Sequence, residues 1–163
     1  AWTTLIASAE KLDDLERIKA VYEPFLASFP LCYGYWKKYA EAEARHQNVA
    51  TALSIYERGT AATPYSMDLW GAYASCKKAN DGTAEEVRSI FERALAYNGS
   101  DYLSHSLWDK YMSFEEEQGS SVTVAALYTR ILSQPLKQLD RYMQSLQSFT
   151  QGRSASELVA PEA

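Results

Sequence analysis

The residues of this chain that could carry out acid–base, nucleophilic or metal chemistry are few and scattered. Its 163 residues include two histidines, His46 and His105, and two cysteines, Cys32 and Cys76. None of them has a second His or Cys at metal-ligand spacing, and the cysteines form no C-x-x-C motif. The sequence also has no phosphate-binding glycine loop and no G-x-S-x-G nucleophile motif. These residue types therefore predict no catalytic residue, no metal site and no cofactor, which indicates a protein that is not an enzyme.

Charged clusters are the remaining candidates for binding. In the run 115–117, three successive glutamates point in different directions on a helix, which favours a solvated helix end over a metal site. Two lysine pairs are the candidate partner-binding residues: Lys37, Lys38, Lys77 and Lys78. One interpretation has each pair divided between a solvated lysine and one that covers an aromatic side chain. The others are a small basic strip that binds an acidic or helical peptide, and direct contact with RNA.

The overall composition restricts the class of protein further. Hydrophobic residues make up 47% and charged residues 23%, which is ordinary for a globular domain. No apolar run approaches the roughly 18 residues that a membrane span requires, so no membrane association is expected. The 16 basic and 21 acidic residues give a net charge of −5, so any contact with nucleic acid must be local. The sequence starts at Ala1 and shows no secretory signal, and we interpret it as an intracellular piece of a longer protein.

Aromatic residues recur along the chain and indicate the elements that would position any site. Tryptophans at 2, 36, 70 and 108 are 34, 34 and 38 residues apart, a period typical of helical-hairpin repeats. A second aromatic follows each of them by 20 or 21 residues. A tyrosine follows three of the tryptophans at i+3, the spacing of neighbours on one helix face. Each unit is therefore predicted to be a helix A, a turn and a helix B.

Local signals support these boundaries. The segment 83–86, Thr-Ala-Glu-Glu, fits a capping box that begins the third B helix, and Gly119 fits the end of the fourth A helix. The predicted fold is an all-α, right-handed α-solenoid of antiparallel helical hairpins. The array spans 1–149, with units at about 1–30, 31–64, 65–100 and 101–135 and a half unit at 136–149. The segment 150–163 is expected to be a flexible tail.

Large aromatic side chains suit such an array because a helical hairpin buries its apolar face only against its neighbours. The predicted structural anchors are Trp2, Tyr22, Trp36, Tyr39, Tyr56, Glu57, Arg58, Trp70, Tyr73, Phe91, Glu92, Arg93, Trp108, Tyr111, Tyr128 and Arg130. A base-stacking platform is the alternative for the tryptophans, but it needs a basic groove beside them. The net negative charge of the chain disfavours a base-stacking platform.

The motifs within each unit resemble the HAT (half-a-TPR) repeat more than the tetratricopeptide repeat. Helix A carries Trp-x-x-Tyr followed by an acid, as in Trp36 to Tyr39 with Glu43, and helix B carries Tyr-Glu-Arg or Phe-Glu-Arg. This resemblance implies that the helix-A acid and the helix-B arginine tie helices together. Three units depart from the pattern: they have Pro24, Lys77 and Thr129 at motif positions.

Longer stretches narrow the resemblance. The stretch 29–40, Phe-Pro-Leu-Cys-Tyr-Gly-Tyr-Trp-Lys-Lys-Tyr-Ala, is similar to the amino-terminal HAT array of the pre-mRNA-processing factor 39 family. The resemblance implies a nuclear, non-catalytic scaffold of the U1 small nuclear ribonucleoprotein that supports 5′ splice-site recognition. It implies protein partners, a U1-C-like protein among them, with indirect or weak RNA contact. Dimerisation is expected through a carboxy-terminal array that this sequence lacks. The alternatives are an adaptor in mRNA 3′-end processing and a helical RNA-binding module.

Overall fold

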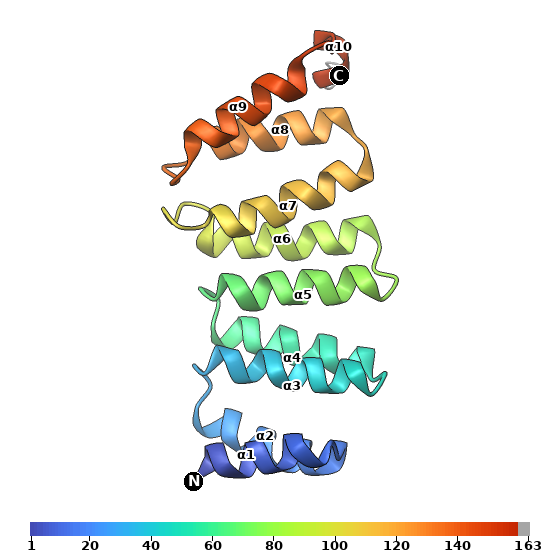
Figure 1. The fold of residues 1–163 in the computed structure, drawn as a ribbon, viewed down its shortest axis with the longest axis vertical. Coiled ribbons are helices and arrows are strands. Elements are labelled where there is room, and N and C mark those ends of the chain that lie inside the picture. Colours follow the sequence, from blue (N-terminus) through green and yellow to red (C-terminus); the bar gives the residue numbers. More distant parts are fainter. Residues whose placement is uncertain (160–163) are drawn as a thin grey trace. The chain divides into compact units, whose positions relative to one another are not determined.

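The computed structural model describes residues 1–159, and all the regular structure in that range is helical. The helices are α1 (Trp2–Leu12), α2 (Leu15–Ser28), α3 (Tyr33–Arg45), α4 (Val49–Ala62), α5 (Met67–Ala79), α6 (Ala84–Asn98), α7 (His105–Gln118), α8 (Ser121–Leu132), α9 (Leu139–Thr150) and α10 (Ala155–Leu158). Successive helices are joined by short turns and run antiparallel as hairpins (Figure 1). None of the described helices is both long and apolar enough to cross a membrane.

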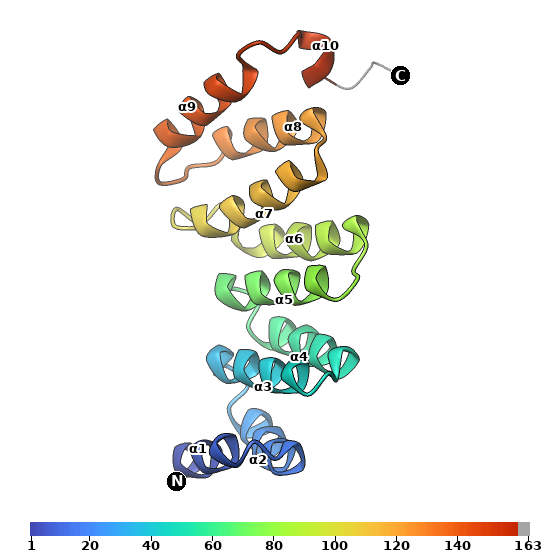
Figure 2. The ribbon, with the colours of Figure 1, turned by 45° about the vertical axis from the view of Figure 1, so that its right-hand side comes forward.

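The chain divides into two compact units whose boundary falls within α6, between Ile90 and Phe91. The first unit contains the hairpins α1–α2 and α3–α4, then α5 and the start of α6. The second contains the rest of α6 and the helices α7 to α10. In this second unit α8 lies between α7 and α9 in both ribbon views (Figure 2). Each unit thus repeats the A–B alternation that the aromatic spacing predicts.

Helix ends are fixed by side chains that bind exposed backbone amides. The Asp14 carboxylate accepts from the Glu16 amide, and the Ser66 hydroxyl accepts from the Leu69 amide. Thr83 and Glu86 form the predicted capping box: the Glu86 carboxylate accepts from the Thr83 amide at 2.9 Å, and the Glu86 amide donates back to the Thr83 hydroxyl.

Glycine ends the fourth A helix. Gly119 follows α7 in the left-handed conformation, with φ of 79°, which glycine adopts without the steric penalty of a side chain. The prediction that this residue ends the helix is confirmed.

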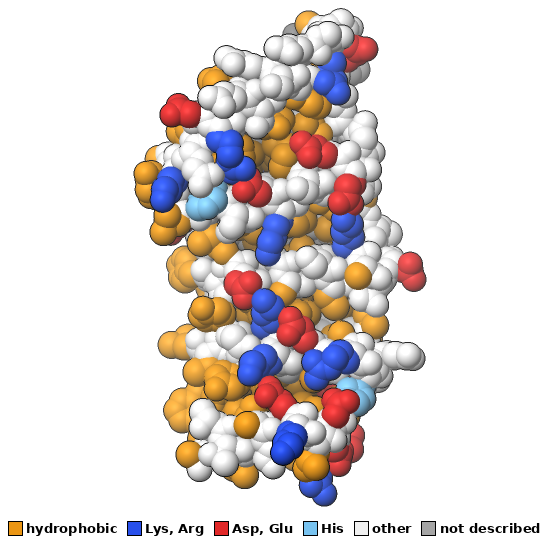
Figure 3. All heavy atoms as spheres, viewed as in Figure 1, with side chains coloured by type: hydrophobic (Ala, Val, Ile, Leu, Met, Phe, Trp, Pro, Cys, Tyr) orange, Lys and Arg blue, Asp and Glu red, His pale blue; other side chains and the backbone are white. Residues whose placement is uncertain are grey.

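The core of each unit combines aliphatic side chains with buried aromatic rings. Trp36 and Trp70 are 4% and 1% exposed in the first unit, and Trp108 is 2% exposed in the second. Trp2 is partly buried and contacts the Phe25 ring, with ring centroids 5.9 Å apart. On the outside, acidic and basic side chains are interspersed over the face shown in Figure 3.

The segment after α9 differs from the expected tail. Its residues 155–158 form helix α10, whose start is capped reciprocally by Ser154 and Glu157. Helix α10 contacts α8, and the Arg153 guanidinium lies over the Phe149 ring. Local capping and this contact give the segment regular structure. Residues 160–163 lie outside the described part of the chain, and the flexibility of the segment stays a prediction.

Candidate functional site

The tryptophans hold the loops that connect successive hairpins. The indole N–H of Trp36 donates to the Pro30 carbonyl at 2.8 Å, and that of Trp70 donates to the Pro64 carbonyl at 2.8 Å. Trp108 reaches Gly99 in the same way at 3.1 Å, across the longer loop between α6 and α7. Each tryptophan is therefore a buried ring whose polar edge fixes the connection that precedes its own helix.

Tyrosines of the A helices stack on aromatic rings of the preceding B helices. Tyr39 lies on Tyr22 with centroids 5.1 Å apart and an interplanar angle of 18°. Tyr111 lies on Phe91 at 4.8 Å and 8° in the second unit. Tyr73 and Tyr56 repeat the stack in the first unit, at 5.7 Å and 11°. The tyrosines three residues after the repeat tryptophans thus stack on the second aromatic series.

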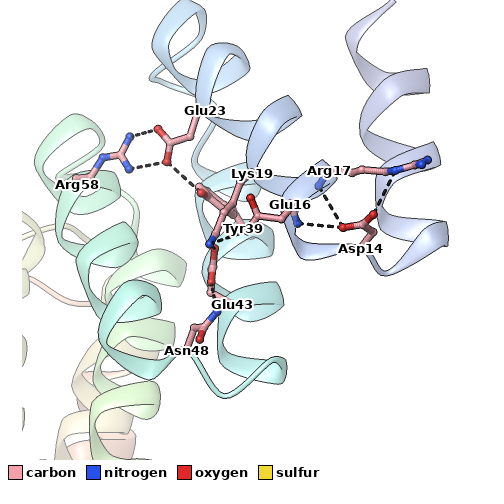
Figure 4. A network of polar contacts seen from close by, with 9 residues as sticks. All are labelled: Asp14, Glu16, Arg17, Lys19, Glu23, Tyr39, Glu43, Asn48 and Arg58. Atoms are coloured by element: carbon pink, nitrogen blue, oxygen red, sulfur yellow. Dashed lines mark hydrogen bonds and ion pairs between the residues drawn. The ribbon is translucent and has the colours of Figure 1, made fainter.

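A carboxylate tie joins the first hairpin to the second through Glu23 (Figure 4). Arg58 on α4 donates two hydrogen bonds to Glu23, at 2.9 and 2.8 Å, and the Tyr39 hydroxyl donates a third at 3.0 Å. The Arg58 guanidinium also lies 5.1 Å from the Trp36 ring centroid. Hydrogen bonds from Arg58 hold the pKa of Glu23 below its usual value, whereas burial, followed by Glu23, raises the pKa of Tyr39. One carboxylate therefore connects α2, α3 and α4.

The same tie recurs in the second unit. Arg130 on α8 donates to Glu92 at 2.7 and 2.9 Å, and the Tyr111 hydroxyl donates at 2.8 Å. The Arg130 guanidinium lies 5.6 Å from the Trp108 ring, and its hydrogen bonds lower the pKa of Glu92. In the first unit, the Tyr73 hydroxyl likewise donates to the Glu57 carboxylate at 2.9 Å.

This geometry accounts for two departures from the repeat motif. Glu23, Glu57 and Glu92 each bind a side chain of the following hairpin. Arg58 and Arg130 each bind the glutamate of the preceding hairpin. Pro24 takes the arginine position of the first hairpin, which still supplies Glu23 to the second. Thr129 takes the glutamate position of the fourth hairpin, which still supplies Arg130 to the third. The first hairpin thus keeps the glutamate that binds the second hairpin, and the fourth keeps the arginine that binds the third.

The helix-A acids take part in a separate set of contacts. Glu43 is fully buried; its carboxylate accepts from the Asn48 side-chain amide at 3.0 Å and lies 3.9 Å from the Lys19 ammonium (Figure 4). Asn48 precedes α4, so Glu43 fastens the turn inside one hairpin. Glu115, at the equivalent place in the fourth hairpin, is also fully buried.

The structure places the candidate partner-binding lysines beside carboxylates. The Lys37 ammonium lies 3.1 Å from Asp68, and the Lys77 ammonium lies 2.8 Å from Glu86. Lys38 lies 3.7 Å from Glu10 and over the Tyr35 ring at 5.7 Å. Lys78 also makes an interaction. Carboxylates therefore offset much of the positive charge here, and a partner-binding role stays a prediction.

Ion pairs between successive A helices were not predicted from the sequence. Lys37 on α3 reaches Asp68 on α5, and Asp109 on α7 reaches Arg141 on α9 at 2.8 Å. Both Lys37 and Asp109 directly follow a repeat tryptophan, but their charges are opposite. An opposite charge about 31 residues later is the only sequence signal of such a pair, and it is weak.

What this arrangement can do is hold hairpins in register and present side chains on their surfaces. Within residues 1–159, no group of three or more His, Cys, Asp and Glu is placed to hold a metal ion. In the ties, glutamate, arginine and tyrosine side chains form hydrogen bonds that join neighbouring helices.

Comparison with known proteins agrees with this architecture. Residues 1–148 match the family described as "PRP39 N-terminal HAT repeat". Pre-mRNA-processing factor 39 of Schizosaccharomyces pombe is 36% identical over 99% of this chain and 28% of its own length, and that of Homo sapiens is 34% identical over 99% of this chain and 25% of its own. The chain thus spans about a quarter of these relatives. The mRNA 3′-end-processing protein rna-14 of Neurospora crassa is 27% identical over 70% of this chain and 10% of its own length.

Among solved structures, the crystal structure of MamA protein superposes with a TM-score of 0.55 and 14% identity, covering 93% of this chain and 80% of that one. That likeness concerns the fold alone. With the family match, it confirms the predicted all-α solenoid class, in which antiparallel helical hairpins stack on one another. The chain belongs to the PRP39 N-terminal HAT repeat family.

Proposed function

We propose that this chain is a non-catalytic, protein-binding scaffold in pre-mRNA splicing. In this role it belongs to the U1 small nuclear ribonucleoprotein in the nucleus and supports 5′ splice-site recognition through protein contacts. The observation that carries the proposal is the match of nearly the whole chain to pre-mRNA-processing factor 39 relatives. The ties support it, because they use the chain's charged groups to hold helices together.

The partners in this proposal are proteins of the particle, a U1-C-like protein among them. RNA is then reached through those proteins. Dimerisation belongs to a carboxy-terminal array outside this chain, so the isolated chain is expected to be monomeric in light scattering.

The test is affinity purification of the full-length protein from nuclear extract of its source cells, followed by quantification of the small nuclear RNAs. We expect U1 RNA to be enriched over U2 and U6 RNA, and deletion of residues 1–149 to remove U1-associated proteins from the purified material. Equal recovery of all three RNAs would count against the proposal.

A second candidate function is an adaptor in mRNA 3′-end processing. The similarity to the Neurospora crassa protein over 70% of this chain favours it. The same purification separates the two functions, because a 3′-end adaptor would recover cleavage and polyadenylation proteins without U1 RNA.

A further inference from the structure

The first repeat tryptophan, Trp2, differs from the later ones at its polar edge. Trp36 and Trp70 each donate their indole N–H to a proline carbonyl at 2.8 Å. The Trp2 ring is partly buried and contacts Phe25, but among residues 1–159 no group accepts a hydrogen bond from its N–H. Packed tryptophan rings usually have an acceptor for this donor. The repeat therefore lacks one hydrogen bond at Trp2.

The two paired tryptophans show where such an acceptor lies. Pro30 stands six residues before Trp36. Pro64 stands six residues before Trp70. In both connections the B helix ends two residues before the proline, and the next A helix begins three residues after it. At the same spacing, the acceptor for Trp2 belongs to residues that precede this chain.

Leu5 marks an uncovered position on the same helix. In the next two hairpins the residue three after the repeat tryptophan is a tyrosine that stacks on the preceding B helix. Tyr39 stacks on Tyr22 in this way. Tyr73 stacks on Tyr56. In α1 the position is Leu5, which is 54% exposed, whereas Tyr39 is 2% exposed. The side of α1 that faces a B helix in the other hairpins is therefore open.

The open side of α1 is apolar. Residues 1–9 include no charged side chain. Leu5 lacks the hydroxyl with which Tyr39 binds a glutamate of the preceding hairpin. Pro24 stands at the position from which Arg58 binds that glutamate. A charged group placed here would lose its hydration without gaining an ion pair. An element that covers α1 therefore gains apolar contact and one indole hydrogen bond, without a carboxylate tie.

We propose that the segment preceding Ala1 in the full-length protein forms a helix that packs on Leu5 and ends at a proline turn, in which the carbonyl six residues before Trp2 accepts the indole N–H. The end of α2 already binds Trp36 through Pro30 in this way. The relatives leave room for such a segment, since this chain spans 28% of the Schizosaccharomyces pombe protein and 25% of the Homo sapiens protein. The inference does not depend on the splicing role.

Hydrogen exchange of the indole N–H groups in the full-length protein tests the proposal. NMR follows isotope-labelled tryptophan, and the variants Trp2→Phe and Trp36→Phe assign the two signals. We expect the Trp2 N–H to exchange within about tenfold of the rate of the Trp36 N–H, because both are then hydrogen-bonded among packed side chains. In the 163-residue chain alone, the Trp2 N–H should exchange at least about 100-fold faster than that of Trp36.

Two charge insertions on α1 of the full-length protein test the covering helix. Leu5→Glu places a charge beneath that helix, so proteinase K should cleave the preceding segment about tenfold faster. Ala7→Glu should leave the cleavage rate unchanged. Ala7 is the matched control because it is exposed, as are its equivalents in the next three A helices: Glu41, Ser75 and Ser113. In the 163-residue chain alone, Leu5→Glu should leave the unfolding midpoint unchanged, since Leu5 is exposed there.

Several results would overturn the proposal. One is a Trp2 N–H that exchanges as fast in the full-length protein as in the 163-residue chain. Another is equal cleavage of Leu5→Glu and Ala7→Glu. Protection that grows with the concentration of the 163-residue chain would make a second copy the occupant, and protection that requires added U1 particle proteins would make a partner the occupant. These outcomes are separate from the recovery of U1 RNA, which tests the splicing function.

Discussion

At the scale of single residues, Trp36, Trp70 and Trp108 each combine burial with one directed hydrogen bond. Trp70 is 1% exposed, and its N–H donates to Pro64. Trp70→Ala should therefore lower the free energy of unfolding by about 3–5 kcal/mol, as other truncations of buried aromatics do. Trp70→Phe should cost less, since it keeps a ring in place. Urea unfolding measures both values.

The matched control for Trp70 is Glu116→Ala, which removes an exposed side chain that has no hydrogen bond. It should change the free energy of unfolding by no more than about 0.5 kcal/mol. Equal unfolding midpoints for Trp70→Ala and Glu116→Ala would contradict the anchoring role.

The carboxylate ties make stability depend on pH. Arg58 holds the pKa of Glu23 below its ordinary value of 4.5. A carboxyl group whose pKa is lowered by folding contributes stability above its unfolded pKa and loses that contribution as the pH falls through its folded pKa. Glu23→Gln should therefore cost about 1 kcal/mol near neutral pH, a modest value because the pair is half-exposed.

Urea unfolding of the parent chain and Glu23→Gln across a pH series tests this prediction. The difference between them should shrink as the pH falls below about 4.5 and through the lowered pKa of Glu23. Glu92→Gln should behave alike in the second unit, and Glu41→Gln should show little difference at any pH. A Glu23→Gln difference that is constant with pH would exclude the tie as its origin.

At the scale of helices, one close approach fixes how α4 lies against α3. A Cβ added to Gly59 would stand 2.9 Å from both Cβ and Cγ of Trp36 and 3.0 Å from a methyl group of Leu69. Gly59→Ala gains about 1 kcal/mol of helix propensity but overpacks this contact by about 1–3 kcal/mol. We expect a net loss of about 1 kcal/mol, measured by thermal unfolding.

Gly34 is the matched control, because it lies in α3 with nothing within 4 Å of an added Cβ. Gly34→Ala should raise stability by up to about 1 kcal/mol, through helix propensity alone. Shifts of the same sign for Gly34→Ala and Gly59→Ala would refute the close packing of α4 on α3.

The helices themselves were predictable because their signals are local. The capping box at Thr83 and the glycine at 119 each act within a few residues of the boundary they mark, and the recurring tryptophans locate the hairpins between such boundaries. The pairing of Glu23 with Arg58 was not predictable, since it depends on how α2 and α4 are rotated against each other. Helix α10 was missed because it is only 4 residues long and its contact with α8 depends on how the two segments pack.

The hollow beside Ser145 shows the same limit. Sequence spacing places a serine where three other A helices carry a tyrosine, but spacing alone does not reveal whether neighbouring side chains close the space. The contacts of Phe149 with Tyr128 and of Tyr142 with Asp109 decide that question, and both depend on the packing of α9.

At the scale of the whole chain, charge sets the affinity that we expect for RNA. The net charge is −5, and Lys37 and Lys77 lie beside Asp68 and Glu86. Because paired lysines release few counterions from a phosphate backbone, we expect weak electrostatic attraction to RNA. The isolated chain should therefore bind a single-stranded RNA 20-mer with a Kd above about 100 μM at 150 mM salt.

A variant that combines Asp68→Asn with Glu86→Gln tests whether these pairs mask the lysines. With Lys37 and Lys77 released, filter binding at low salt should tighten, and the plot of log K against log salt should steepen by about 1.4, or about 0.7 for each phosphate that a released lysine neutralises. Glu41→Gln with Glu85→Gln removes the same two charges without freeing a paired lysine, so it should leave the slope unchanged. Submicromolar binding by the parent chain with a steep salt slope would instead make RNA its direct ligand, since such a slope reports the phosphates that its own side chains neutralise.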